Sequence, residues 1–348
     1  MTAMIGPELN NSPQREDFAR SRAAGLRCND VVIAIDESHI SQKAIPYGIA
    51  VANALGAGVV LLRILEPGER NGKLTDPVEW QLLRQQARSQ IETLAGRQSH
   101  EIEYVETEIQ EGRPSDQICR WARDHNVSLT VICSQGGGRA NAQELGRTAR
   151  CVIEHAHGSV LLVPATVEER ESVHYHRIFV PLDGSSRAES ALPVALRLAE
   201  AQPAEIFLVH AVPEPELTEV GPLEAEDIEL RARLLRRNER VARSYLDRVR
   251  ARLAGKSVPV QILLLCGGDA RHLLMRAFMD QRADLVVMAS HGHGSHMDVP
   301  LGGVASHMIA QTPVPLLLVR NHIVSDKTRG AGIGAFAPKP QYASRTAA

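Results

Sequence analysis

Short apolar runs alternate with amphipathic segments along most of the chain. In the first half the strand-like runs are VVIAI, VVLLRIL, EIEYVETEI, LTVIC and SVLLVP, and helical patterns lie near residues 41–55, 78–95, 114–125 and 146–155. Runs of Val, Leu and Ile without polar interruption indicate strands that are buried on both faces. The alternation predicts an α/β fold, in which an open five-stranded parallel sheet carries helices on both faces.

The same pattern occurs twice. The stretch VVIAIDESHISQKAIP (31–46) matches IFVPLDGSSRAESALP (178–193) at an offset of 147 residues, and residues 128–164 match 284–320 at an offset of 156. The offsets differ by nine residues, which places one insertion in the middle of the second copy. Self-similarity of this extent identifies a tandem duplication.

Domain boundaries follow from the repeat. We expect a first domain over 27–165 and a second over 177–321, joined by a short polar linker over 166–176. Two such domains agree with a chain of 348 residues. Residues 1–26 and 322–348 are rich in Gly, Ser, Pro, Arg and Ala without an apolar period, so the prediction for both tails is disorder.

Composition narrows the classes of function. A formal net charge of −2 gives no general attraction to nucleic acid or to an acidic membrane surface. The five cysteines form no CxxC pair and no secretory signal is evident, which together indicate a reducing cytoplasm. No stretch approaches the roughly 20 apolar residues of a membrane span. One amphipathic segment, 223–253, carries nine arginines, either as a solvated helix face or as a surface for a partner or polyanion.

Three features occur at matching places in the two copies. An Asp, Asp36 or Asp183, directly follows the first apolar run, a small-residue AIP or ALP step comes next, and a glycine loop precedes the last helix. With these features the chain resembles a tandem universal stress protein over residues 28–321. Members of that family have a phosphate loop of the form G-x2-G-x9-G-[S/T], and many bind ATP. The resemblance implies two flavodoxin-like, Rossmann-like domains with ATP or another adenine nucleotide as ligand.

In the second copy the loop pattern falls on Ala289, Gly292, Gly302 and Gly303. The two inner glycines have the family spacing, but the first glycine is replaced by Ala and the final hydroxyl residue by Gly. The loss of the hydroxyl removes one phosphate hydrogen bond, worth about 1 kcal/mol. The N–H groups of Gly303 and Val304 at the start of the next helix would complete an anion-binding nest. The second domain is therefore the main predicted nucleotide site.

In the first copy the pattern falls on Cys133, Gly136, Gly146 and Arg147. We expect Cys133 to add bulk where the backbone should approach a phosphate. Arg147 stands in place of the hydroxyl residue and could supply a positive charge to an anion. The first domain is accordingly the weaker predicted site.

By the same resemblance, Asp36 and Asp183 contact the nucleoside. The backbone of the second strand, near Ile64 and Ala211, would lie beside the adenine. Because a helix begins shortly after each aspartate, helix N-caps are the alternative interpretation of both residues.

Three histidines in the second glycine loop, His291, His293 and His296, could serve as ligands to Zn or Cu. No Cys or carboxylate at ligand spacing completes a tetrahedral site. The family register places this loop around phosphate, so the prediction is a loop without metal.

The best interpretation is a stress-response protein that binds an adenine nucleotide, mainly in its second domain. The sequence has no Walker motif and no evident paired acid and base, so turnover is not expected. An interaction scaffold without nucleotide and a slow nucleotide hydrolase are the alternatives. The very apolar last strands, GSVLLVP and VPVPLLLVR, predict that the domains pack through them as an internal pseudo-dimer, and a homodimer fits the same pattern.

Overall fold

The fold is taken from a computed structural model of the chain. The structure describes residues 30–67, 69–70, 73–74, 76–98, 100–137, 145–215, 225–292 and 301–320. The two tails that are predicted to be disordered, 1–26 and 322–348, lie outside these residues.

Strands and helices alternate in both halves of the chain. The elements of the first half are β1 (Val31–Ile35), α2 (His39–Gln42), α3 (Ala44–Leu55), β2 (Val59–Leu65), β3 (Glu69–Arg70), β4 (Lys73–Leu74), α4 (Pro77–Gln98), β5 (Val105–Glu111), α5 (Pro114–Asp124), β6 (Leu129–Cys133), α6 (Arg147–His155) and β7 (Ser159–Val163). Those of the second half are β8 (Arg177–Pro181), α7 (Ser186–Glu189), α8 (Leu192–Ala201), β9 (Glu205–Val212), α9 (Ala225–Leu253), β10 (Val260–Cys266), α10 (Ala270–Asp280), β11 (Leu285–Ala289), α11 (Gly303–Gln311) and β12 (Leu316–Val319).

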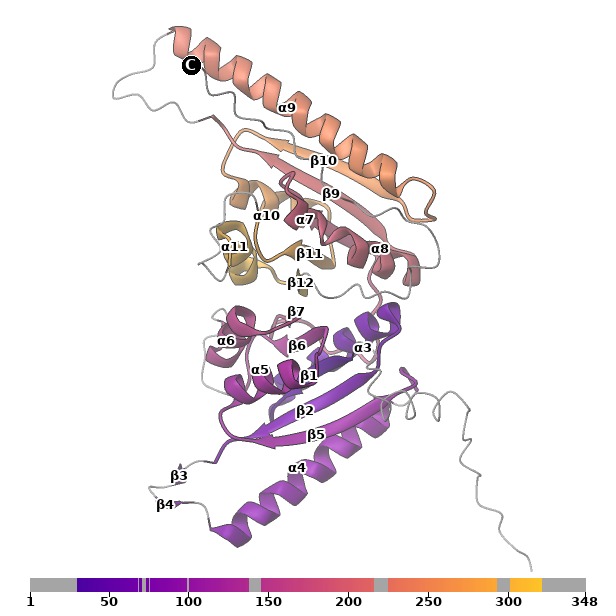
Figure 1. The fold of residues 1–348 in the computed structure, drawn as a ribbon, viewed down its shortest axis with the longest axis vertical. Coiled ribbons are helices and arrows are strands. Elements are labelled where there is room, and N and C mark those ends of the chain that lie inside the picture. Colours follow the sequence, from indigo (N-terminus) through magenta and orange to yellow (C-terminus); the bar gives the residue numbers. More distant parts are fainter. Residues whose placement is uncertain are drawn as a thin grey trace, which may run out of the picture.

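Ten of the described strands form one sheet in the order β10-β9-β8-β11-β12-β7-β6-β1-β2-β5 (Figure 1), and β3 and β4 pair antiparallel as a separate two-stranded sheet. Within the ten-stranded sheet each half has the strand order 3-2-1-4-5, and all pairs inside a half are parallel. This is the order of a Rossmann-like doubly wound sheet, so the predicted α/β class is confirmed. In such sheets the strand order reverses between the first and fourth strands, here β8 and β11, and ligands bind beyond the strand ends at that point.

Helices cover both faces of the sheet. One apolar core lies under α3, α4, α8 and α9, and the other lies under α5, α6, α10 and α11. Strands β1, β6, β7 and β12 are buried along their whole length, as their uninterrupted apolar runs predict. Within the described residues, no helix is both long and apolar enough to cross a membrane.

The first helix of each half differs from the sequence prediction. Instead of one helix over 41–55, the chain forms α2 and then α3, and the second half has the matching pair α7 and α8. Pro46 and Pro193 explain the break, because proline has no N–H to donate to the carbonyl four residues earlier. The third strand also begins later than EIEYVETEI suggests, since β5 covers Val105–Glu111.

The nine-residue insertion lengthens the second half near its long helix. Helix α9 has 29 residues, whereas its counterpart α4 has 22. The additional turns place the start of α9 over the carboxyl ends of the strands, beside the site described next.

Candidate nucleotide site

The carboxyl ends of β8, β9 and β11 and the starts of α10 and α11 enclose a cavity of about 720 Å³ in the second domain. Seven residues that the sequence proposed for this domain line it: Asp183, Ala211, Ala289, Gly292, Gly302, Gly303 and Val304. They come from four separate stretches of the chain, and the fold brings all of them together.

Asp183 and Gly292 are in direct contact in the wall of this cavity. A Cβ atom at Gly292 would overlap Oδ2 of Asp183, so only a glycine permits the carboxylate to lie here. The other oxygen, Oδ1, accepts a hydrogen bond from the backbone N–H of Ser185 at 2.9 Å. The first domain repeats the arrangement, since a Cβ at Gly136 would overlap Oδ2 of Asp36.

The N-cap interpretation of the two aspartates is wrong. The N-caps of α2 and α7 are Ser38 and Ser185, whose hydroxyl oxygens accept hydrogen bonds from Ser41 and Ala188. Each aspartate instead accepts the backbone N–H of its capping serine. Neither carboxylate caps its helix, and Asp183 lines the cavity of the second domain.

The second half of the glycine loop leads into α11. Gly302 is the N-cap of this helix and donates its N–H to the carbonyl of Ser290 at 3.1 Å. A Cβ at Gly303 would meet no atom within 4 Å. The first N–H groups of α11 have no partner within the helix, and they line a cavity with room for an anion beside them.

The cavity is also lined by four charged residues that were not among the proposed site residues: Glu214, Arg231, Asp269 and Arg271. The Arg231 guanidinium lies 3.5 Å from the Glu214 carboxylate and donates to the carbonyl of Pro215 at 3.1 Å. Arg271 forms a bidentate ion pair with Asp269, with 2.6 Å between Nη2 and Oδ2, and hydrogen bonds from Arg271 lower the pKa of Asp269 well below its usual range. Arg231 lies in the added turns of α9 and is one of the nine arginines of segment 223–253, so the insertion and the arginine-rich segment were the two signals for it in the sequence.

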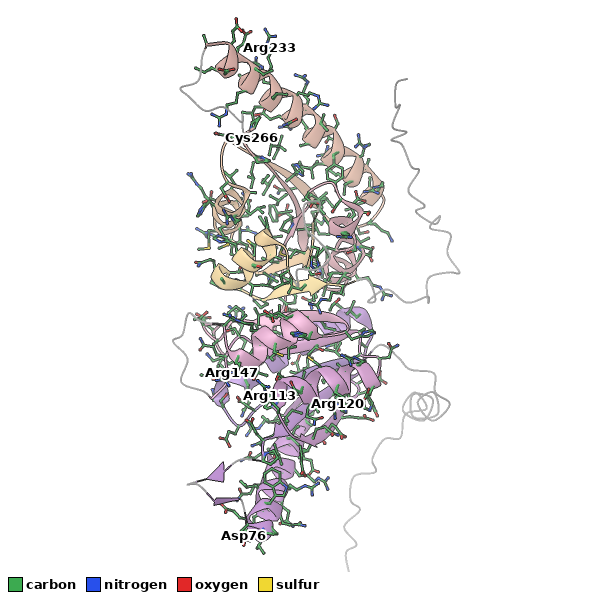
Figure 2. The ribbon with its side chains drawn as sticks, turned by 60° about the vertical axis from the view of Figure 1, so that its left-hand side comes forward. Asp76, Arg113, Arg120, Arg147, Arg233 and Cys266 are labelled. Atoms are coloured by element: carbon green, nitrogen blue, oxygen red, sulfur yellow. The ribbon has the colours of Figure 1, made fainter. Side chains whose placement is uncertain are left out.

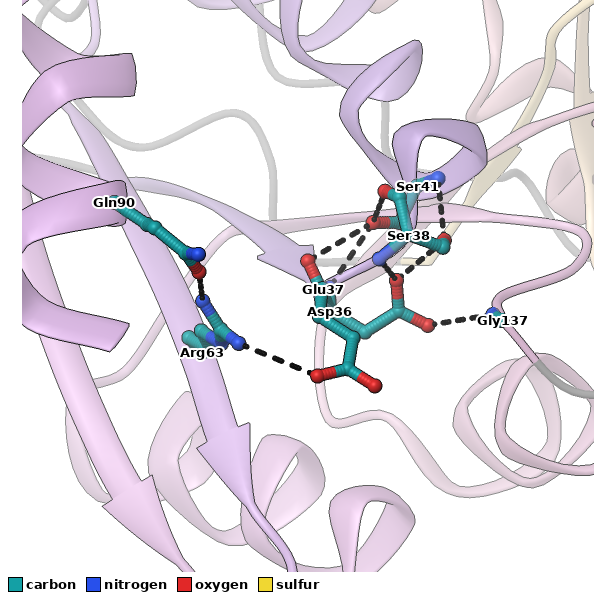
Figure 3. Close-up of polar contacts among 7 residues, drawn as sticks. All are labelled: Asp36, Glu37, Ser38, Ser41, Arg63, Gln90 and Gly137. Atoms are coloured by element: carbon teal, nitrogen blue, oxygen red, sulfur yellow. Dashed lines mark hydrogen bonds and ion pairs between the residues drawn. The ribbon is translucent and has the colours of Figure 1, made fainter. Parts of the chain in front are cut away.

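The first domain forms a polar network at the matching place (Figure 3). Oδ1 of Asp36 accepts from the N–H and hydroxyl of Ser38 at 2.8 and 2.5 Å, and Oδ2 accepts from the N–H of Gly137 at 3.0 Å. Burial alone would raise the pKa of Asp36, but these hydrogen bonds and that of Ser41 outweigh it and lower the pKa. Asp36 is therefore a firmly ionised group.

Behind Asp36, the buried side chain of Arg63 reaches from β2 toward the same edge. It donates to Gln90 at 2.6 Å and lies 3.9 Å from the Glu37 carboxylate (Figure 3). Burial lowers the pKa of Arg63, and the neighbouring carboxylates act in the opposite sense. Ile64, the predicted adenine neighbour, follows Arg63 near the end of β2 and is half-buried against the core.

The loop of the first domain corrects one expectation. Cys133 does not add bulk to the site, because its thiol side chain is buried in the apolar core and only 3% exposed. Gly146 is the N-cap of α6 and donates to Ser134 at 2.8 Å, as Gly302 does to Ser290. Arg147 is the first residue of α6 and is exposed.

The histidines can be followed only in part. His291 lines the cavity, with its Nδ1 3.0 Å from the hydroxyl of Ser290. His293 and His296 lie outside the described residues. The residues that the structure does describe contain no cluster of His, Cys, Asp and Glu able to hold a metal ion.

Comparison with known proteins agrees with this geometry. A family model described as the universal stress protein family matches residues 28–164 and 174–320. A universal stress protein of Thermus aquaticus is 33% identical over 147 residues, which are 42% of this chain and 99% of that protein. A universal stress protein of Mycobacterium tuberculosis is 27% identical over 199 residues, covering 56% of this chain and 59% of its own length, which is less than two thirds.

A solved structure has a similar fold over most of the chain. The crystal structure of a universal stress protein from Archaeoglobus fulgidus has a TM-score of 0.57 at 18% identity, and the match covers 84% of this chain and 96% of that one. At this identity the likeness concerns the fold alone. The two consecutive family matches account for nearly all of the described residues, and the chain therefore belongs to the universal stress protein family, with two of its domains in tandem.

Proposed function

We propose that this universal stress protein binds an adenine nucleotide, ATP, in the cavity of its second domain. One observation carries the proposal: the seven residues proposed from the sequence, spread from Asp183 to Val304, line a single cavity. Its volume of about 720 Å³ is in the range of small-molecule sites. A shared cavity is what a common ligand requires.

Each part of the cavity suits one part of the nucleotide. The N–H groups of Gly303 and Val304 would donate to phosphate oxygens. Asp183 would accept hydrogen bonds from the ribose hydroxyls, and the backbone at Ala211 would lie beside the adenine. Met288 and Leu274, which also line the cavity, offer apolar contact to a purine ring.

We propose binding without rapid turnover. Both cationic side chains that line the cavity, Arg231 and Arg271, are held by carboxylates, and Asp183 already accepts from Ser185. A phosphoryl-transfer site needs free cations or a metal around the leaving phosphate. We also propose that the two domains act as an internal pseudo-dimer, joined by β7 and β12, in the cytoplasm.

Calorimetric titration of ATP tests the site. Gly302→Val adds a branched side chain at the N-cap of α11, which lines the cavity, and Gly302 has φ −69° and ψ 154°, which valine also adopts. We expect ATP binding to weaken roughly 30- to 150-fold, equivalent to about 2–3 kcal/mol. The matching Gly146→Val should reduce ATP binding less. Equal losses would contradict the asymmetry between the domains, and unmodified protein that does not bind ATP would favour the scaffold.

A further inference from the structure

In the part of the chain that the structure describes, the ten-stranded sheet ends in two edge strands, β10 in the second domain and β5 in the first. The apolar last strands of the two domains, β7 and β12, pair with each other and are not available to a second molecule. An edge strand presents backbone N–H and C=O groups that can pair with a strand of another chain. A partner that extends this sheet must therefore bind at β10 or at β5.

The two edge strands differ in charge. Three of the seven residues of β5 are glutamates, Glu106, Glu108 and Glu111, whereas β10 has the sequence VQILLLC without a charged residue. Charged side chains on an edge strand are one of the devices by which proteins prevent edge-to-edge pairing. Strand β5 has this protection, and β10 does not.

The side chains of β10 are apolar on both faces of the sheet and only partly covered. Helix α9 packs on one face of this strand and α10 on the other, yet the four aliphatic residues from Ile262 to Leu265 remain half-buried. By contrast, β7 and β12 have a neighbouring strand on each side and are buried along their whole length. A further strand beside β10 would cover its remaining apolar surface.

The sequence of β10 is complementary to itself. The register that pairs all seven residues of two antiparallel β10 strands puts Leu263 on a two-fold axis, opposite its own copy, and Ile262 opposite Leu264. None of the facing pairs includes a charge. In the same register β5 would put Glu108 opposite Glu108, and like charges directly opposite each other are destabilising. The chemistry of the β10 edge thus fits a second copy of this chain.

The helices beside β10 are compatible with such a junction. Where β7 and β12 pair antiparallel, α3 and α8 pack beside the two strands, and a junction of two β10 strands would bring the two copies of α9 together in the same way. Figure 2 shows Cys266 at the end of β10, and both Glu239 and Arg243 of α9 lie close to its thiol. The side of α9 next to β10 therefore carries charges of both signs, although the helix as a whole is rich in arginine.

We propose that the protein forms a homodimer by antiparallel pairing of β10 with β10 of a second copy, which joins two ten-stranded sheets into one. The interface is isologous, because the same strand contributes to both sides of a two-fold axis. This inference concerns an edge of the sheet and does not depend on the nucleotide site.

Two measurements on the unmodified full chain test the proposal. Sedimentation velocity over a range of concentrations should show a monomer that converts to a dimer. Hydrogen exchange should then locate the interface: within 260–266, the amides that point away from β9 should exchange at least about tenfold more slowly in the dimer, because they become ladder donors. The amides of 105–111, on the other edge, should exchange equally in both states.

Leu263→Lys tests the register, since it puts two lysines opposite each other on the axis and should weaken the dimer at least about tenfold. The monomer should stay folded, because the lysine stem can cover the half-buried position while its ammonium group reaches solvent. Circular dichroism checks the fold. The matched control is Gln110→Lys, which makes the same change of charge on β5 and should leave the dimer within about twofold.

A chain that stays monomeric at every concentration would overturn the proposal. So would a dimer in which the amides of 260–266 exchange at the monomer rate, or one that both lysine variants weaken equally. Slow exchange of 260–266 that does not change with concentration would show that another segment of the same chain covers the edge, and this too would overturn it. If Leu263→Lys does not fold, the exchange rates of the unmodified chain decide.

Discussion

At Gly292 and Gly136 the neighbouring aspartate, and not the backbone, excludes a side chain. Neither glycine has a positive φ, so alanine would fit the local chain conformation. In each case the added methyl group would displace a carboxylate oxygen of Asp183 or Asp36. The spacing of glycine and aspartate along the sequence thus encodes a single contact, between the end of the first strand and the loop after the fourth.

Gly303 offers a test by gain of function. Gly303→Ser restores the hydroxyl of the family loop, and its side chain would enter open space. We expect ATP to bind about fivefold more tightly, because one phosphate hydrogen bond contributes about 1 kcal/mol. The control is Gly303→Ala, which adds the same Cβ without the hydroxyl and should leave the affinity nearly unchanged. If both variants bind ATP equally well, the hydroxyl makes no contact with phosphate.

Among the elements, the buried strands were the easiest to predict. Strands such as β1 and β6 are continuous apolar runs, and such runs are typical of strands that are buried on both faces of a sheet. The start of β5 was harder, because the residues of this edge strand are only half-buried and polar residues alternate along it. The break between α2 and α3 depends on Pro46. This proline is visible in the sequence, but the helical pattern over residues 41–55 does not reveal that the helix breaks there.

The residues of the candidate site likewise differ in how well the sequence predicts them. The glycines and aspartates follow from motif spacing, which is local. Arg231 could not be placed, because it reaches the cavity through the packing of a whole helix, α9. The predicted bulk of Cys133 was wrong for a related reason: a residue at the end of a strand can point to the core or to the ligand, and spacing alone does not decide between them.

Helix α6 is held at its C-terminus by the other domain. Arg320, which follows β12, donates from its guanidinium to the carbonyls of Ile153 and Ala156, and its N–H donates to Ser159 at 2.9 Å. Burial lowers the pKa of Arg320. These carbonyls are among the last of α6, which have no partner within the helix. A cation at this end also complements the helix dipole.

Arg320→Met should therefore destabilise the first domain, although the change lies in the second. Methionine keeps much of the apolar volume but leaves two buried carbonyls without donors, so the free energy of unfolding should fall by about 2 kcal/mol. Urea titration measures it. Arg276→Met is the matched control, since that side chain is 85% exposed, and a change within about 0.5 kcal/mol is expected. Equal shifts for the two variants would show that the cap contributes nothing.

At the scale of the whole molecule, the two domains share one sheet. Strands β7 and β12 pair antiparallel, with Leu318 opposite Val160 and Leu316 opposite Leu162. Helices α3 and α8 pack beside this junction, where the Gln202 amide donates to the carbonyl of Ala50 at 3.0 Å. Strands that would be exposed apolar edges in separate domains cover each other here, which favours a single unit over two independent ones.

The tryptophans allow this coupling to be measured. Both tryptophans of the chain, Trp80 and Trp121, lie in the first domain, so their fluorescence reports the unfolding of that domain alone. Leu318→Asp places a carboxylate at a position in the second domain that is 0% exposed, at the cost of several kcal/mol. If the domains unfold together, the urea midpoint of the tryptophan signal should fall. An unchanged midpoint would show that the domains are independent. Adding Val160→Lys should recover part of the loss, because Val160 is the cross-strand partner of Leu318 and opposite charges in contact are coupled by roughly 0.5–3 kcal/mol.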